Sequence, residues 1–295
     1  MFAQLALALA VGSSPAEPHP VVGGSPAPGE EFSAVVRLEV PGIERFCSGT
    51  LIRPDVVLTA AHCLTPLWGP EDLTLVFDGS TRRYVEAAEI HVHPDYAGPD
   101  GGLDRFDFGY IRLTSPVDVQ PLAVLTEQAL WDETMAKGSE VMVVGYGEVP
   151  ERTNGALDRW MVPARIRAFT ETGFEFLAGG DGMDSCGGDS GGPALVAAAD
   201  GTLWVAGVTS RGSKECGDGG FYGVAYHALP WLTDELDDVS LCGSSCGTCD
   251  CLDTTPLPED GCCSTGRPDD LPWALLVLFI LRRKKRPTNE KAPRD

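Results

Sequence analysis

From residue 21 to about residue 236, the chain is a succession of short apolar segments separated by Gly, Pro, Asn and Asp. Segments of this kind, bounded by turn residues, are typical of strands in an all-β sandwich or a pair of barrels. Near the end of this region, residues 227–236 place apolar side chains at roughly helical spacing. The sequence therefore predicts an all-β domain followed by one short helix. The expected strands include residues 32–40, 56–58, 73–77, 110–113, 141–144 and 203–208.

The charge balance excludes some classes of partner. The 295 residues suffice for one large domain or two small ones, and they carry 22 Lys and Arg against 43 Asp and Glu, a formal net charge of −21. Nucleic-acid-binding proteins usually carry a basic patch, so this balance argues against nucleic acid as a partner. The main basic concentration, residues 282–295 with seven basic and two acidic side chains, is interpreted as a membrane-topology signal.

The ten cysteines form two groups, four between Cys47 and Cys216 and six further along the chain. An even number of cysteines in a chain with export signals favours disulfides over cytosolic thiols. The second group lies in residues 238–270, which are rich in Asp, Gly, Ser, Thr and Pro and are predicted to form a stalk or linker without a core. Some of the spacings also suit a zinc site, so disulfides and zinc ligands are both open, with disulfides favoured. This group comprises Cys242, Cys246, Cys249, Cys251, Cys262 and Cys263.

The N-terminus has the pattern of an export signal. Residues 2–11 form an apolar run, and small residues follow it. This pattern predicts a signal peptide over residues 1–16 and a short propeptide over residues 17–20. The usual basic residues before the apolar run are missing, so a core helix or strand is the alternative. We expect the protein to be secreted or held at the cell envelope.

The C-terminus has three parts in order: a Cys pair, an apolar stretch over residues 271–281, and a cluster of Arg and Lys. As a helix, the apolar stretch would rise about 16 Å, short of the ~30 Å hydrocarbon core of a bilayer. The order resembles the MYXO-CTERM class of bacterial sorting signals, in which a sorting protease removes the tail. Residues 271–295 are therefore interpreted as a sorting or anchor segment that contacts the membrane, and a permanent anchor is the alternative.

Three segments contain the side chains that nucleophilic catalysis requires. His62 ends the sequence Leu-Thr-Ala-Ala-His, Asp107 begins the apolar sequence Asp-Phe-Gly-Tyr-Ile, and Ser190 lies in Gly-Gly-Asp-Ser-Gly-Gly-Pro. Taken singly, each is more often structural. A serine hydroxyl, however, becomes a nucleophile when a base lies within hydrogen-bond reach, and histidine can accept and return a proton near neutral pH. An acidic residue can orient that histidine and stabilise its charged form.

With spacings of 45 and then 83 residues, these segments resemble the chymotrypsin/trypsin family of serine endopeptidases, and the match covers residues 21–237. The resemblance implies two six-stranded antiparallel β-barrels with the active site between them, a short C-terminal helix, a monomer, and no cofactor or metal. It also implies that Ser190 is the nucleophile, His62 the base and Asp107 its orienting partner. The N–H groups of Gly188 and Ser190 would form the oxyanion hole.

The resemblance extends to the N-terminus. Val21 begins the sequence Val-Val-Gly-Gly, which resembles the mature N-terminus of the family. There the new α-amino group pairs with the acid before the nucleophile, here Asp189. We therefore expect an inactive zymogen until a protease cuts before Val21. Pro20 stands where family zymogens usually have Arg or Lys, which argues against trypsin-type autoactivation and leaves the activating protease open. The family also implies two disulfides, Cys47–Cys63 and Cys186–Cys216.

The substrate pocket is predicted on the same basis. Asp184 matches the acid at the base of the pocket in trypsin-like members, and Gly212 and Gly220 match the two wall glycines. Ser210 and Gly212 would hydrogen-bond the substrate backbone as a short antiparallel strand. A buried carboxylate at the end of an open slot favours a cationic partner, so we expect cleavage of polypeptides after Arg or Lys. The alternative for Asp184 is that it caps a turn.

Other interpretations are also open. Arg211 stands at a position that is usually aromatic, and a cation there is expected to disfavour basic residues further upstream, giving a narrower, non-tryptic specificity. A non-catalytic binding module with a protease fold is the other alternative, although such modules usually lose a triad residue. His91 and His93 alternate along a strand and could suggest a metal site, but a structural role is favoured for both.

Overall fold

The computed structural model describes residues 23–27, 29–42, 47–79, 81–147, 159–213, 215–243, 249 and 251–256, and the statements below refer to these residues. The predicted signal peptide, propeptide and C-terminal segment lie outside them, as do Val21 and three of the cysteines. Those cysteines are Cys246, Cys262 and Cys263.

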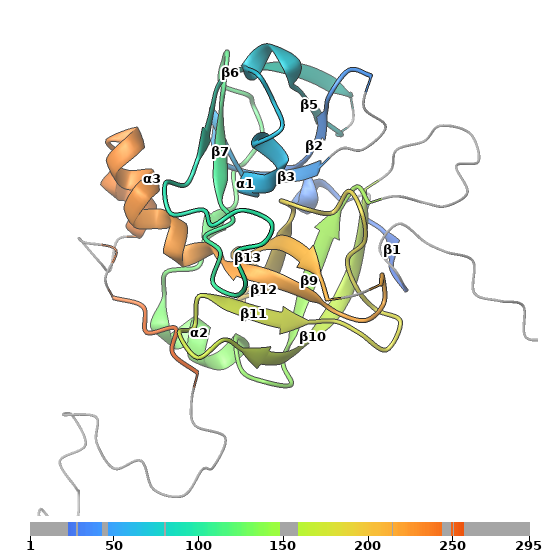
Figure 1. Cartoon of the computed structure of the whole chain (residues 1–295), viewed down its shortest axis with the longest axis vertical. Coiled ribbons are helices and arrows are strands. Elements are labelled where there is room, and N and C mark those ends of the chain that lie inside the picture. The colour runs from blue at the N-terminus through green and yellow to red at the C-terminus, as the bar shows by residue number, and fades with distance from the viewer. Residues whose placement is uncertain are drawn as a thin grey trace, which may run out of the picture. The chain divides into compact units, whose positions relative to one another are not determined.

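Six antiparallel strands form the first barrel, which lies in the upper half of Figure 1. Its pairing order is β2-β3-β4-β7-β6-β5, and β5 closes the barrel by pairing with β2. On β4, Val57 faces the core of this barrel, while Val56 and Leu58 belong to the neighbouring core cluster. This strand is a continuous apolar run because both of its faces are buried. The strands are β2 (Val35–Glu39), β3 (Cys47–Arg53), β4 (Val56–Thr59), β5 (Thr74–Phe77), β6 (Arg83–Val92) and β7 (Gly109–Leu113).

The second barrel closes in the order β9-β10-β11-β14-β13-β12, with β12 returning to β9. Two short strands join its edges: β1 (Ser25–Pro26) pairs with β10, and β8 (Ala123–Val124) runs parallel to β13. The predicted pair of six-stranded antiparallel barrels is therefore confirmed. The barrel strands are β9 (Glu140–Gly145), β10 (Trp160–Phe169), β11 (Glu175–Ala178), β12 (Pro193–Ala197), β13 (Leu203–Gly212) and β14 (Gly220–Val224).

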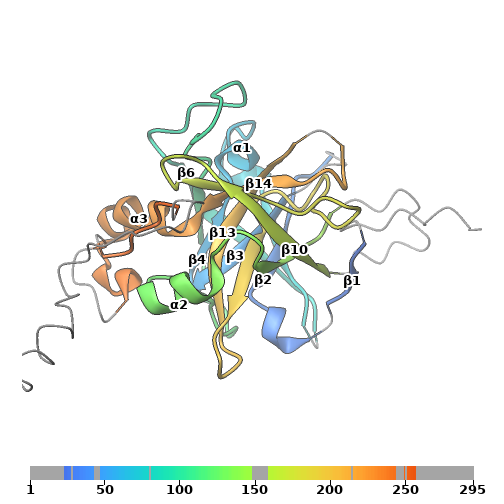
Figure 2. The ribbon, with the colours of Figure 1, turned by 90° about the horizontal axis from the view of Figure 1, so that it is seen from below.

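Helices are short and lie outside the barrels (Figure 2). The predicted C-terminal helix is α3 (Leu229–Leu236), which buries Leu229 and Leu232 and ends where Asp237 adopts a left-handed conformation with φ of 49°. Among the described residues, we find no helix with the length and apolar character needed to cross a membrane. The remaining helices are α1 (Ala61–Leu64), α2 (Gln128–Thr134) and the 3-10 turns η1 (Glu30–Phe32), η2 (Pro70–Asp72), η3 (Ala225–Ala228) and η4 (Val239–Cys242).

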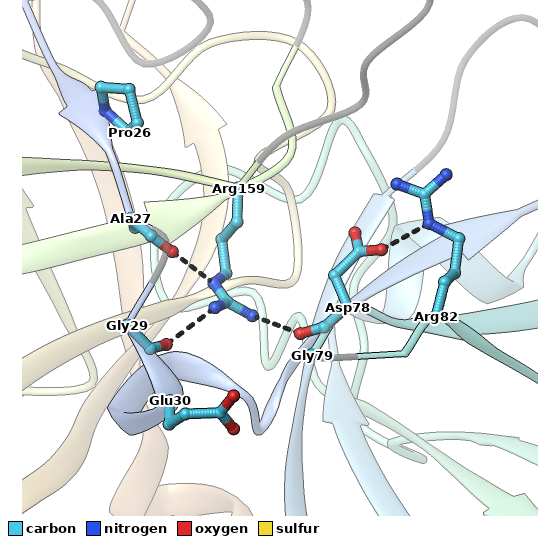
Figure 3. Close-up of a pocket in the computed structure, with 8 residues that line it drawn as sticks. All are labelled: Pro26, Ala27, Gly29, Glu30, Asp78, Gly79, Arg82 and Arg159. Atoms are coloured by element: carbon cyan, nitrogen blue, oxygen red, sulfur yellow. Dashed lines mark hydrogen bonds and ion pairs between the residues drawn. The ribbon is translucent and has the colours of Figure 1, made fainter.

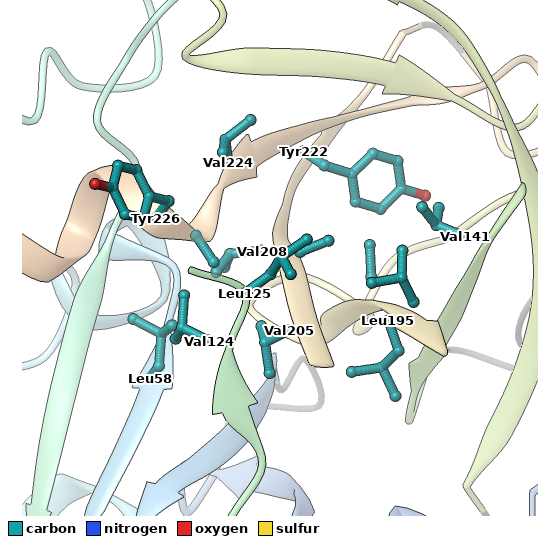
Figure 4. Packing of buried hydrophobic residues seen from close by; sticks show 14 of the residues in the cluster. Leu58, Val124, Leu125, Val141, Leu195, Val205, Val208, Tyr222, Val224 and Tyr226 are labelled. Atoms are coloured by element: carbon teal, nitrogen blue, oxygen red, sulfur yellow. The ribbon is translucent and has the colours of Figure 1, made fainter. Parts of the chain in front are cut away.

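One hydrophobic cluster joins the two barrels. Figure 4 shows part of it, with Leu58 from the first barrel near Val205 and Val208 from the second, and with Tyr222 further along the same cluster. These side chains are almost fully inaccessible to solvent. Burying a Val or Leu side chain contributes about 1.5–3 kcal/mol, so this shared cluster holds the two barrels in a fixed arrangement. A site built from both barrels can then keep its geometry.

A segment after α3 and η4 returns to the domain; we call Cys249 and residues 251–256 the C-terminal strap. A disulfide joins Cys242 to Cys249, and both belong to the main core cluster together with Leu252. The Tyr226 hydroxyl donates to the Cys249 carbonyl at 2.5 Å and accepts from the Leu252 N–H at 3.0 Å. The composition of residues 238–270 predicts no core, but a disulfide and a buried tyrosine attach the described part of this segment to the barrel.

Replacing Tyr226 with Phe is expected to lower the free energy of unfolding by about 1–3 kcal/mol, because the change leaves a buried carbonyl and a buried N–H without partners. Urea unfolding of the full chain measures this loss. Tyr84→Phe is the matched control, since its side chain is 62% exposed. Equal stability of the Tyr226 and Tyr84 variants would show that the two hydrogen bonds of the Tyr226 hydroxyl contribute nothing to the fold.

Candidate active site

His62 and Asp107 are brought together by two neighbouring strands. His62 lies in α1, directly after β4, and Asp107 lies just before β7, which pairs with β4 through Thr59 and Gly109. The His62 Nδ1 atom lies 2.8 Å from Asp107 Oδ2, and the His62 backbone N–H donates to Asp107 Oδ1 at 2.9 Å. Both carboxylate oxygens therefore hold this one histidine, which fixes the ring and leaves Nε2 free to face a substrate.

The Asp107 carboxylate is buried, with 4% of the residue exposed. Its Oδ2 atom also accepts a hydrogen bond of 2.6 Å from the Ser210 hydroxyl on β13. Burial alone would raise the pKa of Asp107, but the hydrogen bonds from His62 and Ser210 outweigh this effect and lower the pKa below its ordinary value. The group therefore stays ionised, and it can stabilise a positive charge on His62.

The turn that holds Ser190 comes from the second barrel and lies beside this pair, and among the described residues no hydrogen bond joins the Ser190 hydroxyl to His62. Its carbonyl accepts a 2.8 Å hydrogen bond from the Ser48 N–H on β3. The Cys63 Sγ atom contacts both the Ser190 carbonyl and His62 Nε2, each at 3.7 Å. Gly191 follows with φ of +81°, and a Cβ there would collide with Thr59 and the Ser48 carbonyl. Only glycine fits this close approach, so the sequence after Ser190 is what lets the loop lie against the first barrel.

The predicted oxyanion-hole residues lie in the same turn. Gly188 has φ of +94°, and its carbonyl accepts a 3.0 Å hydrogen bond from the Ser48 hydroxyl. No described residue accepts a hydrogen bond from the N–H of Gly188 or Ser190. The Ser48 hydroxyl also accepts from the Tyr146 N–H at 3.0 Å, so Ser48 holds this turn from behind. Ser48 was not among the predicted site residues, because its sequence neighbours point only to the adjacent Cys47.

Asp189 is fully buried between two backbone donors. Its oxygens accept from the Gly147 N–H at 2.8 Å and the Cys186 N–H at 2.9 Å. Burial raises the pKa of Asp189 to about 7; the two hydrogen bonds oppose this rise, and the charge of Asp184 adds to it. No cation pairs with Asp189 among the described residues. Gly23, near the start of the described chain, lies against Gly182.

Asp184 is also fully buried, beside the predicted pocket wall. Its oxygens accept from the Ser185 N–H at 2.7 Å and the Gly219 N–H at 2.8 Å, and they lie next to Gly220. Burial raises the pKa of Asp184, although the hydrogen bonds from Ser185 and Gly219 oppose the rise. A Cβ placed on Gly212 would meet only open space. In the described part of the chain, no cationic side chain pairs with Asp184.

The family comparison matches most of the chain. Residues 21–232 match the family model described as trypsin. The chain belongs to the trypsin family of serine proteases. It is 28% identical to a tryptase from Mus musculus over 242 residues, covering 72% of this chain and 87% of the relative.

Two further relatives of the trypsin family differ in the specificity that their names suggest. Chymotrypsin-like elastase family member 1 from Homo sapiens is 32% identical over 211 residues, covering 64% of this chain and 80% of the relative. A trypsin from Saccharopolyspora erythraea is 30% identical over 192 residues, covering 60% of this chain and 82% of the relative. Membership of the trypsin family therefore indicates polypeptide substrates and leaves the preferred residue to be argued from the pocket.

Disulfides brace both halves of this trypsin-family site. Cys47 pairs with Cys63, beside His62, with Cα atoms 6.1 Å apart, and Cys186 pairs with Cys216 with Cα atoms 5.1 Å apart. The ligand atoms of Cys47, His62 and Cys63 lie within 4.8 Å of one another, as in a metal site. Because the two sulfurs are bonded to each other, they do not offer the thiolates that a metal would need.

His91 and His93 contact different surroundings. The His93 ring is buried and stacks on Phe106 at 5.0 Å, and burial lowers its pKa. The His91 ring stacks on Tyr110 at 4.5 Å and contacts Glu89 at 3.1 Å. Each ring therefore has a packing role.

A pocket away from this site lies between the N-terminal segment and the loop after β5 (Figure 3). Its Arg159 side chain donates to the carbonyl oxygens of Ala27 at 3.1 Å, Gly29 at 2.9 Å and Asp78 at 3.3 Å. The guanidinium is therefore satisfied internally. These contacts attach Ala27 and Gly29 to Arg159, which precedes β10 of the second barrel, and join them through Arg159 to Asp78 of the first, so the segment after the expected activation cut has a fixed anchor.

Proposed function

We propose that this protein is an exported serine endopeptidase that cleaves polypeptides after Arg or Lys through an acyl-enzyme. The observation that carries the proposal is the Asp107–His62 pair lying against the Ser190 turn. His62 Nε2 accepts the proton of Ser190 Oγ as that oxygen attacks the substrate carbonyl, and it then gives the proton to the leaving amine. A water molecule, activated by His62 in the same way, releases the acid and restores Ser190.

Charge develops on two groups during this reaction. The carbonyl oxygen becomes an oxyanion, and the N–H groups of Gly188 and Ser190 would stabilise it. His62 becomes an imidazolium, and the ionised Asp107 stabilises it through Nδ1. The hydrogen bonds from Ser48 to the Gly188 and Ser190 carbonyls support this geometry because they hold the backbone of the turn that carries both N–H groups.

The preference for Arg or Lys rests on Asp184. Its buried carboxylate lies beside Gly220 and has no cationic partner among the described residues, so a substrate cation would supply the missing opposite charge. The backbone of Ser210 and Gly212, at the end of β13, would pair with the substrate as an added strand. The disulfides favour an oxidising compartment, in keeping with export and with display at the envelope.

The test is a panel of chromogenic peptides with Arg, Lys, Phe or Ala before the scissile bond, assayed on protein cut before Val21. We expect kcat/KM for Arg and Lys to exceed that for Phe by about a hundredfold or more, and Asp184→Asn to remove most of this difference. Asp181→Asn is the matched control, since that side chain is 92% exposed. Active sites are counted with a serine-directed phosphonate, with Ser190→Ala as the blank.

Two outcomes would contradict the proposal in different ways. Turnover of the Phe peptide equal to that of the Arg peptide would discard the role given to Asp184 and leave a peptidase of another specificity. A cut, folded protein that the phosphonate does not label would discard the peptidase itself and favour a binding module.

A further inference from the structure

Arg211 and Glu175 form a buried ion pair beside the strand that would bind substrate. The two guanidinium nitrogens Nη1 and Nη2 each lie 2.8 Å from a different oxygen of Glu175. The side chain of Glu175 is 3% exposed and that of Arg211 is 17% exposed. One face of the guanidinium also covers the Phe221 ring, with 4.4 Å from Cζ to the ring centre. The geometry is bidentate, which is the strongest form of this pair.

The pair also holds the loop that leads to Asp107. Glu175 accepts hydrogen bonds from the N–H groups of Asp104 at 3.0 Å and Arg105 at 3.4 Å, and Arg211 donates to the Gly102 carbonyl at 3.2 Å. Asp104 has φ of 54°, a conformation that non-glycine residues adopt at a cost. The loop therefore keeps this conformation because the ion pair binds its backbone.

A continuous set of hydrogen bonds connects the pair with the catalytic acid. Arg211 Nη1 donates to the Ser210 hydroxyl at 3.3 Å, and that hydroxyl donates to Asp107 Oδ2 at 2.6 Å. The Ser210 hydroxyl thus connects Arg211 to Asp107. Arg211 is also next to Ser210 and Gly212, where an upstream substrate segment would pair.

Two further charged residues of this loop, Asp104 and Arg105, are also engaged, whereas Asp100 is exposed to solvent. The Asp104 carboxylate accepts from the hydroxyls of Thr170 and Thr172, each at 2.7 Å, and Arg105 Nε donates to the Gly102 carbonyl at 2.7 Å. Asp104 and Arg105 carry opposite charges, as do Glu175 and Arg211. The wall of the upstream subsites therefore carries opposite charges in adjacent pairs, although Arg211 taken alone would make it positive.

We propose that the Glu175–Arg211 pair determines specificity upstream of the scissile bond. It supplies a rigid wall and cancels the charge of Arg211, so the enzyme discriminates little between acidic and basic residues there. This inference rests on the proposed peptidase function and adds to it the chemistry of the upstream subsites. It also changes the expectation drawn from Arg211 alone, because the sequence does not reveal its partner 36 residues away.

Removing one charge of the pair at a time is expected to change the upstream preference in opposite directions. Glu175→Gln keeps the size of the side chain but leaves the positive charge of Arg211 uncompensated, so peptides with upstream Asp or Glu should become preferred over those with Lys. Arg211→Gln leaves the negative charge of Glu175, so the preference should reverse. Each shift in the ratio of kcat/KM values is expected to be about fivefold or more at low salt, and smaller at high salt.

The experiment uses cut enzyme and peptides that share the best residue before the scissile bond and vary Asp, Gln or Lys at the upstream positions. The wild type should keep all ratios within about threefold, and the double variant Glu175→Gln/Arg211→Gln should return to that range. Glu140→Gln is the matched control, because it breaks an exposed ion pair with Arg165 at 3.1 Å. Phosphonate labelling counts the competent sites of every variant.

The outcomes separate this inference from the peptidase proposal. A wild type that already prefers acidic upstream residues tenfold, and loses that preference in Arg211→Gln, would show that the charge is not cancelled and overturn the inference. Unchanged ratios in both single variants would overturn it as well. If Glu175→Gln does not fold, Arg211→Gln alone decides: a shift of the preference toward upstream Lys supports the inference, and an unchanged preference overturns it. Absence of labelling and turnover in the wild type would instead count against the peptidase.

Discussion

Asp107→Asn is expected to lower kcat by about 10⁴-fold near neutral pH, the size of loss that this change causes in a Ser-His-Asp triad. The Asp107 carboxylate accepts from two groups of His62 and from the Ser210 hydroxyl. A carboxamide has one accepting oxygen, so its NH₂ group must face a donor or force His62 into the other tautomer. In that tautomer Nε2 carries the proton and cannot take one from Ser190.

The measurement is kcat on an amide substrate, corrected for the fraction of sites that the phosphonate labels. Ser210→Ala is the control within the same network, because it removes one hydrogen bond and leaves the charge. Its effect should be about tenfold to a hundredfold, in keeping with one hydrogen bond to a charged group, and so well below that of Asp107→Asn. A loss of less than tenfold for Asp107→Asn, with His62 and Ser190 intact, would mean that Asp107 does not orient the base.

Cutting before Val21 is expected to raise kcat/KM by about 10²- to 10³-fold, the contribution of an oxyanion-hole donor. Asp189 is a fully buried carboxylate held by the N–H groups of Gly147 and Cys186 and by no described cation. A new α-amino group would supply that cation and hold the Gly188–Ser190 turn. After the cut, the Asp189→Asn variant should therefore stay near the activity of the uncut chain. The control Asp200→Asn, at an exposed turn, should gain activity on cutting as the wild type does.

The stability of the uncut chain should report on the same carboxylate. Burial raises the pKa of Asp189 to about 7, above its value of about 4 in an unfolded chain. A raised pKa stabilises the folded state fully below pH 4, and this contribution is lost as the pH rises through 7. The difference in the free energy of unfolding between the wild type and Asp189→Asn should therefore fall across this interval in the uncut chain, and the fall should shrink after the cut. An uncut chain as active as the cut one would contradict this account of activation.

The apolar segments and the helical pattern predicted the fold because strands and helices have different periods along the chain. The expected strand at residues 56–58 is β4, and the expected helix near the end of the domain is α3. Of the proposed catalytic residues, His62 and Asp107 meet because β4 and β7 are neighbours in the first barrel. The Ser190 turn comes from the second barrel, and a hydrogen bond from the Ser48 N–H to the Ser190 carbonyl holds it against β3. The strap was not predicted, since polar composition does not reveal that Tyr226 holds its backbone.

By itself, the sequence determined the family and the two-barrel fold, and it led to the residues that we propose carry the reaction. These features depend on which residue types occur and in what order, so they can be recognised from the spacing of residues along the chain. Only the tertiary structure decided that Ser48 holds the Gly188 carbonyl from 140 residues away, and that Glu175 takes up the charge of Arg211. The physical reason is that a side chain's electrostatic effect depends on which partners the fold places within hydrogen-bond distance. Here the fold places the buried carboxylate of Glu175 against an arginine whose partner the sequence does not reveal.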